Sequence, residues 1–293
     1  MASHVTAVPL SAADDPAPPP PPTRRRGRSG RARTALLGLP IPILFLLVWH
    51  FGRQYAWELP FGLRMGFLPY PRDVAVSLVN YAVGTRDDAF SYGLWEDLPA
   101  SALRVVSGFG LATLVAVPLG VLMGRSSTVY ALFDPVINLF RPVPATAWVP
   151  LVALLIGYGD QASIFLITLS AFFPIVLGAI SGARQVPERL LEAARMLGTS
   201  ELGTLLRVVL PAAAPSIVNG MRVGLGLAWV ILVLSETTGV PTGLGSTIFL
   251  ARDVVRTDLI VVGMICIAIA GFLSDRLLTL LFRTAFRNRP LIK

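Results

Sequence analysis

The residue types that carry out most enzyme chemistry are scarce in this chain of 293 residues. Its only lysine is Lys293, so no internal lysine is present for a Walker phosphate loop or for a Schiff base. Its only cysteine, Cys266, lies in an apolar run, which excludes an internal disulfide and a cysteine-based zinc site. The two histidines, His4 and His50, fall in a proline-rich tail and at the end of an apolar segment. We therefore expect a protein that is not an enzyme and that binds no metal.

Polar residues interrupt the apolar run 213–237 at helical spacing. Intervals of three and four residues place a set of them on one helical face: Asn219, Arg222, Gly226, Trp229, Val233 and Glu236. An ionisable group in hydrocarbon costs about 2.5–3.5 kcal/mol, so this face is expected to line a translocation path or to pack against protein. In the second alternative Arg222 marks the inner membrane boundary. We expect Glu236 to be paired, with Arg141 and Arg104 as candidate partners.

A second unusual segment is Arg141-Pro142-Val143-Pro144. Two prolines two residues apart disrupt the helical hydrogen bonds, and a broken helix at membrane depth is tolerated only beside a cavity or other protein. We predict a kink or gate at residues 141–150, with Trp148 as its bulky closing element. The predicted translocation path thus comprises Arg141, Pro144, Trp148, Asn219, Arg222, Trp229 and Glu236.

The elements that position these residues are predicted to be membrane-spanning helices. Only 14% of the residues are charged and 54% are hydrophobic, whereas soluble domains contain about 25% charged residues. The mean hydropathy is +0.68. Six apolar runs approach the roughly 20 residues that cross a bilayer: 35–51, 105–124, 137–158, 162–183, 213–237 and 259–282. We therefore predict an all-α, polytopic membrane protein with six transmembrane helices.

Two shorter patterns concern packing. Residues 73–81 are predicted to form an amphipathic helix with Val74, Leu78 and Tyr81 on one side. The pairs Gly120 with Gly124 and Gly220 with Gly224 have the spacing that lets helices approach closely in membranes.

The net charge of +8 is distributed as an orientation signal, which argues against nucleic acid as a partner. If the N-terminus is cytoplasmic, 16 of the 25 Lys and Arg residues fall in cytoplasmic segments and 6 in outer segments. Such an excess on the inner side favours cytoplasmic N- and C-termini. The same orientation places the loop 184–211 in the cytoplasm.

The N-terminal tail, residues 1–34, contains a proline-rich stretch followed by six arginines. Its composition predicts disorder, and its basic end predicts a role in membrane orientation. An arm that binds a partner or anionic lipids is the alternative. We disfavour a cleaved signal peptide at 24–50, because no small-residue cleavage site follows and five further apolar runs do.

The loop 184–211 is predicted to be a helix–turn–helix. Pro187 suits the first turn of a helix, Gly198 can end that helix in a left-handed conformation, and Thr199 or Ser200 can cap a second helix that runs to Pro211. Glu188 and Glu192 share a face, Ala193 and Ala194 allow close approach, and Leu190, Leu191 and Leu197 provide apolar anchorage. Such a hairpin is a docking surface or, alternatively, a solvated connector.

This loop resembles the EAA signature of ABC importer permeases. The resemblance lies in Glu192-Ala193-Ala194, then Gly198, then Val208-Val209-Leu210-Pro211. In that family the loop forms a coupling helix that fits a cleft on a cytoplasmic ATPase. The resemblance therefore implies that the ATPase-coupling residues are Glu188, Glu192, Ala193, Ala194, Arg195, Gly198, Leu210 and Pro211.

The resemblance covers about residues 68–285 and is strongest to the nitrate, sulfonate, taurine and bicarbonate group of these permeases. The matching stretches are 101–109, 118–124, 141–151, 172–174 and Gly243-Leu244-Gly245. It implies the type I importer permease fold in a bacterial inner membrane, with residues 35–293 as the permease domain. It also implies a second copy of this chain, two ATPase subunits that bind ATP and Mg, and an extracytoplasmic substrate-binding protein. This chain itself is expected to bind no cofactor.

The resemblance implies alternating access driven by the ATPase, with a nitrate-, sulfonate-, taurine- or bicarbonate-like anion as cargo. A vitamin precursor or another small polar molecule is the alternative cargo. A channel or secondary transporter that works alone would leave the EAA loop unexplained. An intramembrane enzyme would need a His, Cys or carboxylate set that the apolar runs lack.

Overall fold

The computed structural model describes residues 40–86, 88–237 and 239–285. The predicted tail, residues 1–34, lies outside this part of the chain. Contacts divide the chain into residues 1–49 and residues 50–293. The first helix, α2 (Pro40–Gln54), crosses that boundary, and the description below concerns the second unit.

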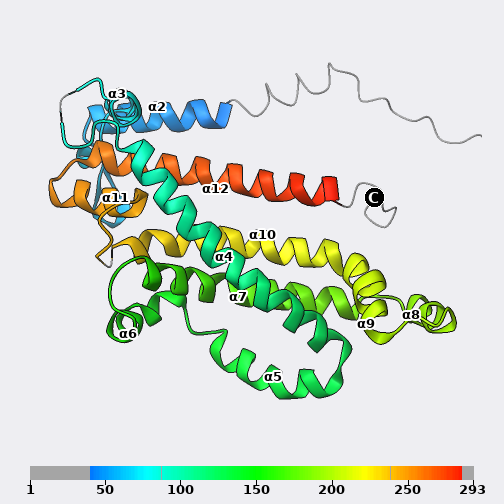
Figure 1. Cartoon of the computed structure of the whole chain (residues 1–293). Helices are drawn as coiled ribbons and strands as arrows, with labels where there is room; N and C mark the ends of the chain where they lie inside the picture. Colours follow the sequence, from blue (N-terminus) through cyan, green and yellow to red (C-terminus); the bar gives the residue numbers. More distant parts are fainter. Residues whose placement is uncertain (1–39, 87, 238, 286–293) are drawn as a thin grey trace, which may run out of the picture. The chain divides into compact units, whose positions relative to one another are not determined.

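The second unit is almost entirely helical (Figure 1). A minimal hairpin pairs β1 (Glu58–Leu59) antiparallel to β2 (Leu63–Arg64). The α-helices then follow in the order α3 (Pro71–Val83), α4 (Leu94–Arg125), α5 (Ser127–Phe140), α6 (Val149–Leu155), α7 (Asp160–Arg184), α8 (Glu188–Met196), α9 (Glu201–Thr204), α10 (Leu210–Glu236), α11 (Leu244–Asp253) and α12 (Thr257–Ala285). Short 3-10 turns occupy Pro60–Gly62, Met65–Phe67 and Ala145–Trp148, and a π-helical turn occupies Leu205–Val209.

Four helical segments of the described chain are long and apolar enough to cross a membrane: Leu94–Arg125, Asp160–Arg184, Glu201–Glu236 and Thr257–Thr284. A fifth span results if α5 and the segment Ala145–Leu155, which meet at 82°, count as one. The prediction of six transmembrane helices is therefore confirmed for four or five. The predicted span 35–51 lies partly outside the described residues; its described part belongs to α2, whose 15 residues are too few for that test.

The predicted span 137–158 is not one continuous helix. It divides at Arg141–Pro144, because α5 ends at Phe140 and the chain resumes in a 3-10 turn at Ala145. Pro144 has an extended backbone, with φ −63° and ψ 140°. The kink predicted from the two prolines is thus present, since neither proline has an N–H with which to continue the helix.

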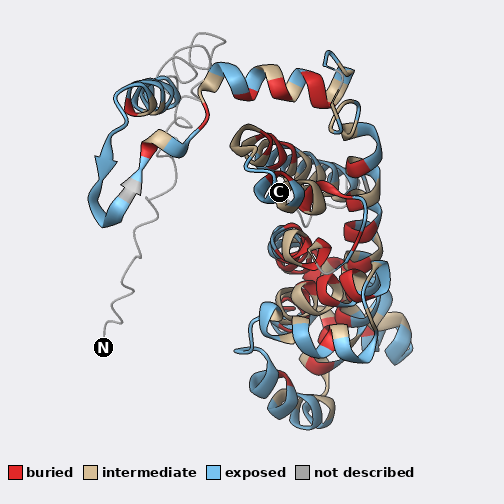
Figure 2. Cartoon of the chain, turned by 90° about the vertical axis from the view of Figure 1, so that its left-hand side faces the viewer, coloured by how far each residue is buried: buried red, intermediate tan, exposed pale blue. Residues whose placement is uncertain are grey.

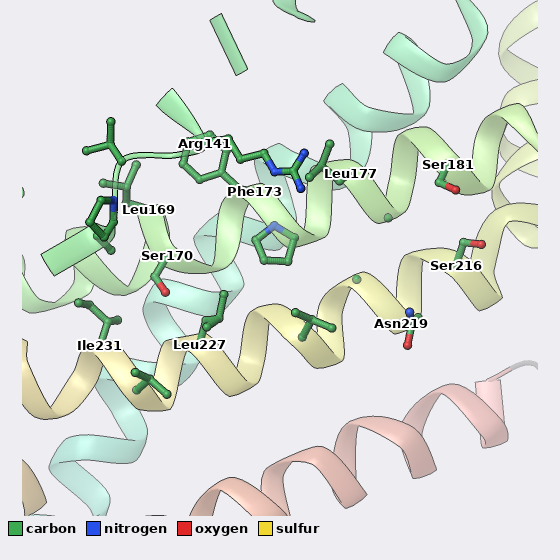
Figure 3. A pocket seen from close by; sticks show the side chains of 18 of the residues that line it. Arg141, Leu169, Ser170, Phe173, Leu177, Ser181, Ser216, Asn219, Leu227 and Ile231 are labelled. Atoms are coloured by element: carbon green, nitrogen blue, oxygen red, sulfur yellow. The ribbon is translucent and has the colours of Figure 1, made fainter. Parts of the chain in front are cut away.

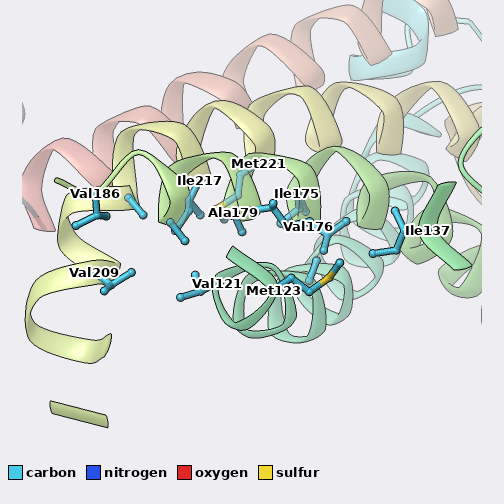
Figure 4. Packing of buried hydrophobic residues seen from close by; sticks show 14 of the residues in the cluster. Val121, Met123, Ile137, Ile175, Val176, Ala179, Val186, Val209, Ile217 and Met221 are labelled. Atoms are coloured by element: carbon cyan, nitrogen blue, oxygen red, sulfur yellow. The ribbon is translucent and has the colours of Figure 1, made fainter. Parts of the chain in front are cut away.

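The core is built around α7, which packs against α4 and α10 (Figure 4). Buried residues, red in Figure 2, gather where helices pack together. Small residues make this possible. A Cβ placed on Gly120 would lie 2.5 Å from the Cβ of Ala179, and one on Gly220 would lie 2.6 Å from the carbonyl oxygen of Pro174. The close packing predicted for the glycine pairs is confirmed, and branched side chains such as Ile175 and Val176 fill the space between.

The amphipathic helix predicted at 73–81 is also confirmed, as part of α3. Val74 and Tyr81 are buried and Leu78 is half-buried. Ser77 donates a hydrogen bond of 2.5 Å to the carboxylate of Asp258 at the start of α12, which ties the two helices together.

The contact between α7 and α10 predicts a position-specific effect of one methyl group. Gly220→Ala should lower the Tm of the purified protein by several degrees, because the new Cβ meets backbone atoms that cannot move independently. Gly226→Ala on the same helix is the matched control, since no atom lies within 4 Å of its Cβ position. Thermal unfolding followed by circular dichroism measures both. Equal Tm values would contradict the close packing.

Candidate functional site

The predicted coupling hairpin lies at the end of the bundle where α7 ends and α10 begins (Figure 1). Helix α8 starts after Pro187, which occupies the N-cap rather than the first turn. Gly198 has φ +70° and ends the helix as predicted. The hydroxyl of Ser200 accepts a 3.2 Å hydrogen bond from the N–H of Gly203 and so caps α9.

The second helix of the hairpin was predicted to end at Pro211. In the structure it continues into α10 instead. A π-helical turn at Leu205–Val209 precedes the proline, and Pro211 lies in the first turn of α10, where its missing N–H costs little. Hairpin and transmembrane helix therefore form one segment, Glu201–Glu236, of 36 residues.

The surface of the hairpin is polar on α8 and apolar at its tip. Most of the predicted coupling residues that α8 and its end contribute are exposed: Glu188, Glu192, Ala193, Arg195 and Gly198. Ala194 and Pro211 are buried and Leu210 is half-buried. The ion pair between Arg195 and Glu188, at 3.6 Å, is too exposed to add much stability.

Two large apolar side chains at the tip were not predicted as surface residues. Met196 is 89% exposed and Leu197 84% exposed. The prediction that Leu197 anchors the hairpin is wrong, because α8 ends there and the side chain leaves the face that carries the buried Leu191. Spacing could not show this, since Leu197 is seven residues from the half-buried Leu190 and would share its helical face if α8 continued.

A cavity of about 930 Å³ lies between α7, α10 and residues 141–146 (Figure 3). It collects three residues of the predicted path, Arg141, Pro144 and Asn219. Trp148 is not among its lining residues; its ring lies 5.9 Å from that of Phe140 at the preceding bend.

The other residues of the predicted path lie elsewhere on α10. Arg222 forms a two-point ion pair with Asp275 of α12, at 2.6 and 2.9 Å, and the indole N–H of Trp229 donates a 3.0 Å hydrogen bond to Ser274. They border a separate cavity of about 540 Å³ against α12. Within one chain, Arg222 and Trp229 thus have the helix-packing contacts that were the alternative to a path.

Glu236 is buried at the opposite end of α10 from the hairpin. Its carboxylate accepts a 2.6 Å hydrogen bond from Arg104 of α4 and a 2.7 Å hydrogen bond from the hydroxyl of Ser101. Arg104 rather than Arg141 is therefore the partner, and it also reaches Asp160 at 2.7 Å. The three residues Arg104, Ser101 and Glu236 are at most 5% exposed.

The same cluster holds the start of α11. The N–H of Gly245 donates to Glu236 at 2.7 Å, and the N–H of Gly243 donates to Asp97 at 2.7 Å. Glycine is required here, because a Cβ on Gly243 would lie 2.5 Å from the Glu236 carboxyl and its φ is +145°. A Cβ on Gly245 would also lie 2.9 Å from a carboxylate oxygen of Glu236, so both glycines of the stretch Gly243-Leu244-Gly245, noted from the sequence, make room for one buried carboxylate.

Tyr81 of α3 completes the cluster. Its hydroxyl donates a 2.6 Å hydrogen bond to Asp97. Burial raises the pKa of Tyr81 above its ordinary value, and the neighbouring Asp97 carboxylate raises it further. The phenol therefore stays protonated and remains a donor throughout the physiological pH range.

The described residues contain no group of three or more His, Cys, Asp or Glu that could hold a metal ion. The buried polar side chains of the cluster around Glu236 form hydrogen bonds with backbone groups and with one another.

Comparison with known proteins places these features in a wider context. Residues 116–287 match the family model described as binding-protein-dependent transport system inner membrane component. The taurine transport system permease protein TauC of Escherichia coli is 37% identical over 211 residues, which cover 71% of this chain and 75% of that protein. The bicarbonate transport system permease protein CmpB of Synechococcus elongatus is 31% identical over 263 residues, 87% of this chain and 92% of that protein.

A solved structure shares the fold. A chain of the MetNI methionine ABC transporter in an inward-facing conformation aligns with a TM-score of 0.50 at 23% sequence identity. The alignment covers 64% of this chain and 94% of that chain. The similarity supports the arrangement of helices described here.

The buried cluster predicts that a single substitution destabilises the protein more than a double substitution does. Arg104→Met should destabilise the protein by about 3–5 kcal/mol, because it leaves the carboxylate of Glu236 buried without its cation. Adding Glu236→Gln to that variant should recover part of the loss by removing the charge. Denaturant unfolding in detergent measures both.

Asp160→Asn is the control within the same cluster. The Asp160 side chain is 66% exposed, so its loss should cost no more than about 1 kcal/mol. A cost as large as that of Arg104→Met, or no recovery in the double variant, would contradict the proposed role of the buried pair.

Proposed function

Because this chain belongs to the binding-protein-dependent transport system inner membrane components, we propose that it is the permease subunit of an ATP-driven importer for a small anion. The observation that carries this proposal is the family match over residues 116–287, which includes both the coupling hairpin and the α7–α10 cavity. Members of the family are transport permeases, and this chain is accordingly a transport subunit and not an enzyme.

The cargo is inferred from relatives. TauC belongs to a taurine transport system and CmpB to a bicarbonate transport system. Taurine and bicarbonate are small molecules with an anionic group, and Arg141 places a positive charge in the large cavity. A nitrate-, sulfonate-, taurine- or bicarbonate-like anion is therefore the proposed cargo.

The proposed machinery contains two copies of this chain, two ATPase subunits that bind ATP and Mg, and an extracytoplasmic binding protein that delivers the solute. The hairpin of α8 and α9 is cytoplasmic, as are both termini. It presents Glu192 and the apolar Met196 and Leu197 to the ATPase. An exposed apolar tip surrounded by charged residues supports a docking surface over a solvated connector.

Movement of the hairpin reaches the membrane through the continuous segment Glu201–Glu236. ATP binding closes the ATPase subunits, and the hairpins follow that closure. The two permease copies then change the side to which their shared path opens. Each state is favoured by contacts that the other lacks, which is the requirement for any driven conformational change.

A charge reversal on the hairpin tests the proposal. Glu192→Arg should reduce co-purification of the ATPase by about tenfold, since an exposed charge within an interface contributes on the order of 1.4 kcal/mol. Uptake should fall with it while expression stays normal. Pull-down from solubilised membranes and solute uptake by cells measure the two effects.

Glu96→Arg is the matched control, because Glu96 is an exposed glutamate in the first turn of α4 and does not belong to the hairpin. It should leave ATPase binding unchanged. Normal binding and coupling in Glu192→Arg would refute the role of this residue. External labelling of cysteines introduced at residues 188–207 in intact cells would refute the orientation.

A further inference from the structure

The side chains that line the α7–α10 cavity differ in polarity between its two ends. Helices α7 and α10 are antiparallel there, because Gly178 of α7 faces Gly220 of α10 and Ala171 faces Gly224. Ser181, Ser216 and Asn219 line the end toward the coupling hairpin. The other end is mainly apolar, with Leu169, Leu227 and Ile231, and it also carries the hydroxyl group of Ser170 (Figure 3).

Arg141 is the one charged side chain among the described residues that line this cavity. It comes from the bend between α5 and α6, and Figure 3 shows its guanidinium beside Phe173 and Leu177. It forms no ion pair with any described carboxylate. This distinguishes Arg141 from Arg104, Arg222 and Arg256, which all have carboxylate partners.

A second cavity of about 450 Å³ adjoins the first toward the coupling hairpin, and Arg141, Leu177 and Ser181 line both. Asp134 and Arg184 line only the second. Arg141 thus lies where the first cavity meets a second cavity that carries charges of both signs.

We propose that the α7–α10 cavity is a selective subsite for small organic anions, in which Arg141 binds the anionic head group and Leu169, Leu227 and Ile231 contact a short hydrocarbon part. The permease thereby adds its own selection to that of any binding protein. An alkanesulfonate or alkanecarboxylate of two to four carbons has the required chemistry. This inference rests on the proposed transport function, of which it names the substrate class.

The apolar end is what favours an organic anion over an inorganic one. Nitrate or bicarbonate entering that end would lose water and gain at most one polar contact, from Ser170, because the leucine and isoleucine side chains offer none. A hydrocarbon part gains there instead, by about fourfold in affinity for each methylene group that leaves water. Guanidinium groups bind sulfonate and carboxylate oxygens by two parallel hydrogen bonds, so the head group suits Arg141.

Charged thiol reagents test the role of Arg141 without knowledge of the natural cargo. The full chain carries Cys266→Ala, which removes its only cysteine, and Ser170→Cys as a reporter in the cavity. The anionic 2-sulfonatoethyl methanethiosulfonate is compared with its cationic trimethylammonium counterpart in nanodiscs. Arg141→Gln should lower the anion-to-cation ratio of modification rates by about tenfold, as expected for one nearby charge.

Arg141→Lys should keep most of the ratio, and Arg72→Gln should leave it unchanged, because Arg72 is an exposed arginine of α3 outside the cavity. An unchanged ratio in Arg141→Gln would overturn the proposal. If the product of the two modification rates equals that of the parent protein, the reporter is equally accessible in the variant, which shows that the variant retains its fold.

Protection of the same reporter tests the apolar end. Butanesulfonate should protect Ser170→Cys from the cationic reagent at a concentration about tenfold lower than nitrate does, and Leu227→Ser should reduce that difference. Equal protection by butanesulfonate and nitrate would overturn the substrate class.

Uptake separates this inference from the function on which it rests. If the wild-type importer in proteoliposomes shows no ATP-dependent uptake of any anion, the proposed function fails, whatever the reagent ratio. If uptake is normal but Arg141→Gln leaves the anion-to-cation ratio of modification rates unchanged, only the proposed subsite fails.

Discussion

The close approach of α7 to α4 and α10 is the constraint on which the rest of this structure depends. Lipid offers no hydrophobic drive for helix association, so contact must come from dispersion between surfaces that fit. Glycines such as Gly120 and Gly220 remove the side chains that would hold the backbones apart. The three helices then position everything else: the hairpin at one end, the polar cluster at the other and the large cavity along the side.

The polar cluster at the end of α10 remote from the hairpin satisfies backbone groups that would otherwise be buried without partners. Helix α11 begins inside the protein, where its first N–H groups cannot reach water, and Asp97 and Glu236 accept hydrogen bonds from them. Arg104 balances the charge of Glu236. Buried charges that are paired and fully hydrogen-bonded are tolerated, whereas any one of them left alone is costly. The cluster thus fixes where α11 starts relative to α4 and α10.

Local rules predicted local features well. Two prolines predicted the bend at Arg141–Pro144, a glycine predicted the end of α8, and burial cost predicted a partner for Glu236, although spacing could not choose between Arg104 and Arg141. Features that depend on neighbours were predicted only in part. Of the stripe on α10, Arg222, Gly226, Trp229 and Val233 do share one surface against α12, whereas Asn219 faces the cavity against α7, because the helix lies between two partners. The predicted span 137–158 was not one continuous helix for a related reason, since hydropathy cannot show where an apolar segment bends by 82°.

One continuous segment joins the coupling hairpin to the buried cluster. Residues 201–236 comprise α9, the π-helical turn and α10, and α10 alone is about 40 Å long at 1.5 Å per residue. Two features interrupt the regular α-helical hydrogen bonds of this segment: the π-helical turn at Leu205–Val209 and, inside α10, Pro215, which has no backbone N–H. A displacement applied at Glu201 therefore reaches Glu236 only to the extent that these two places resist bending.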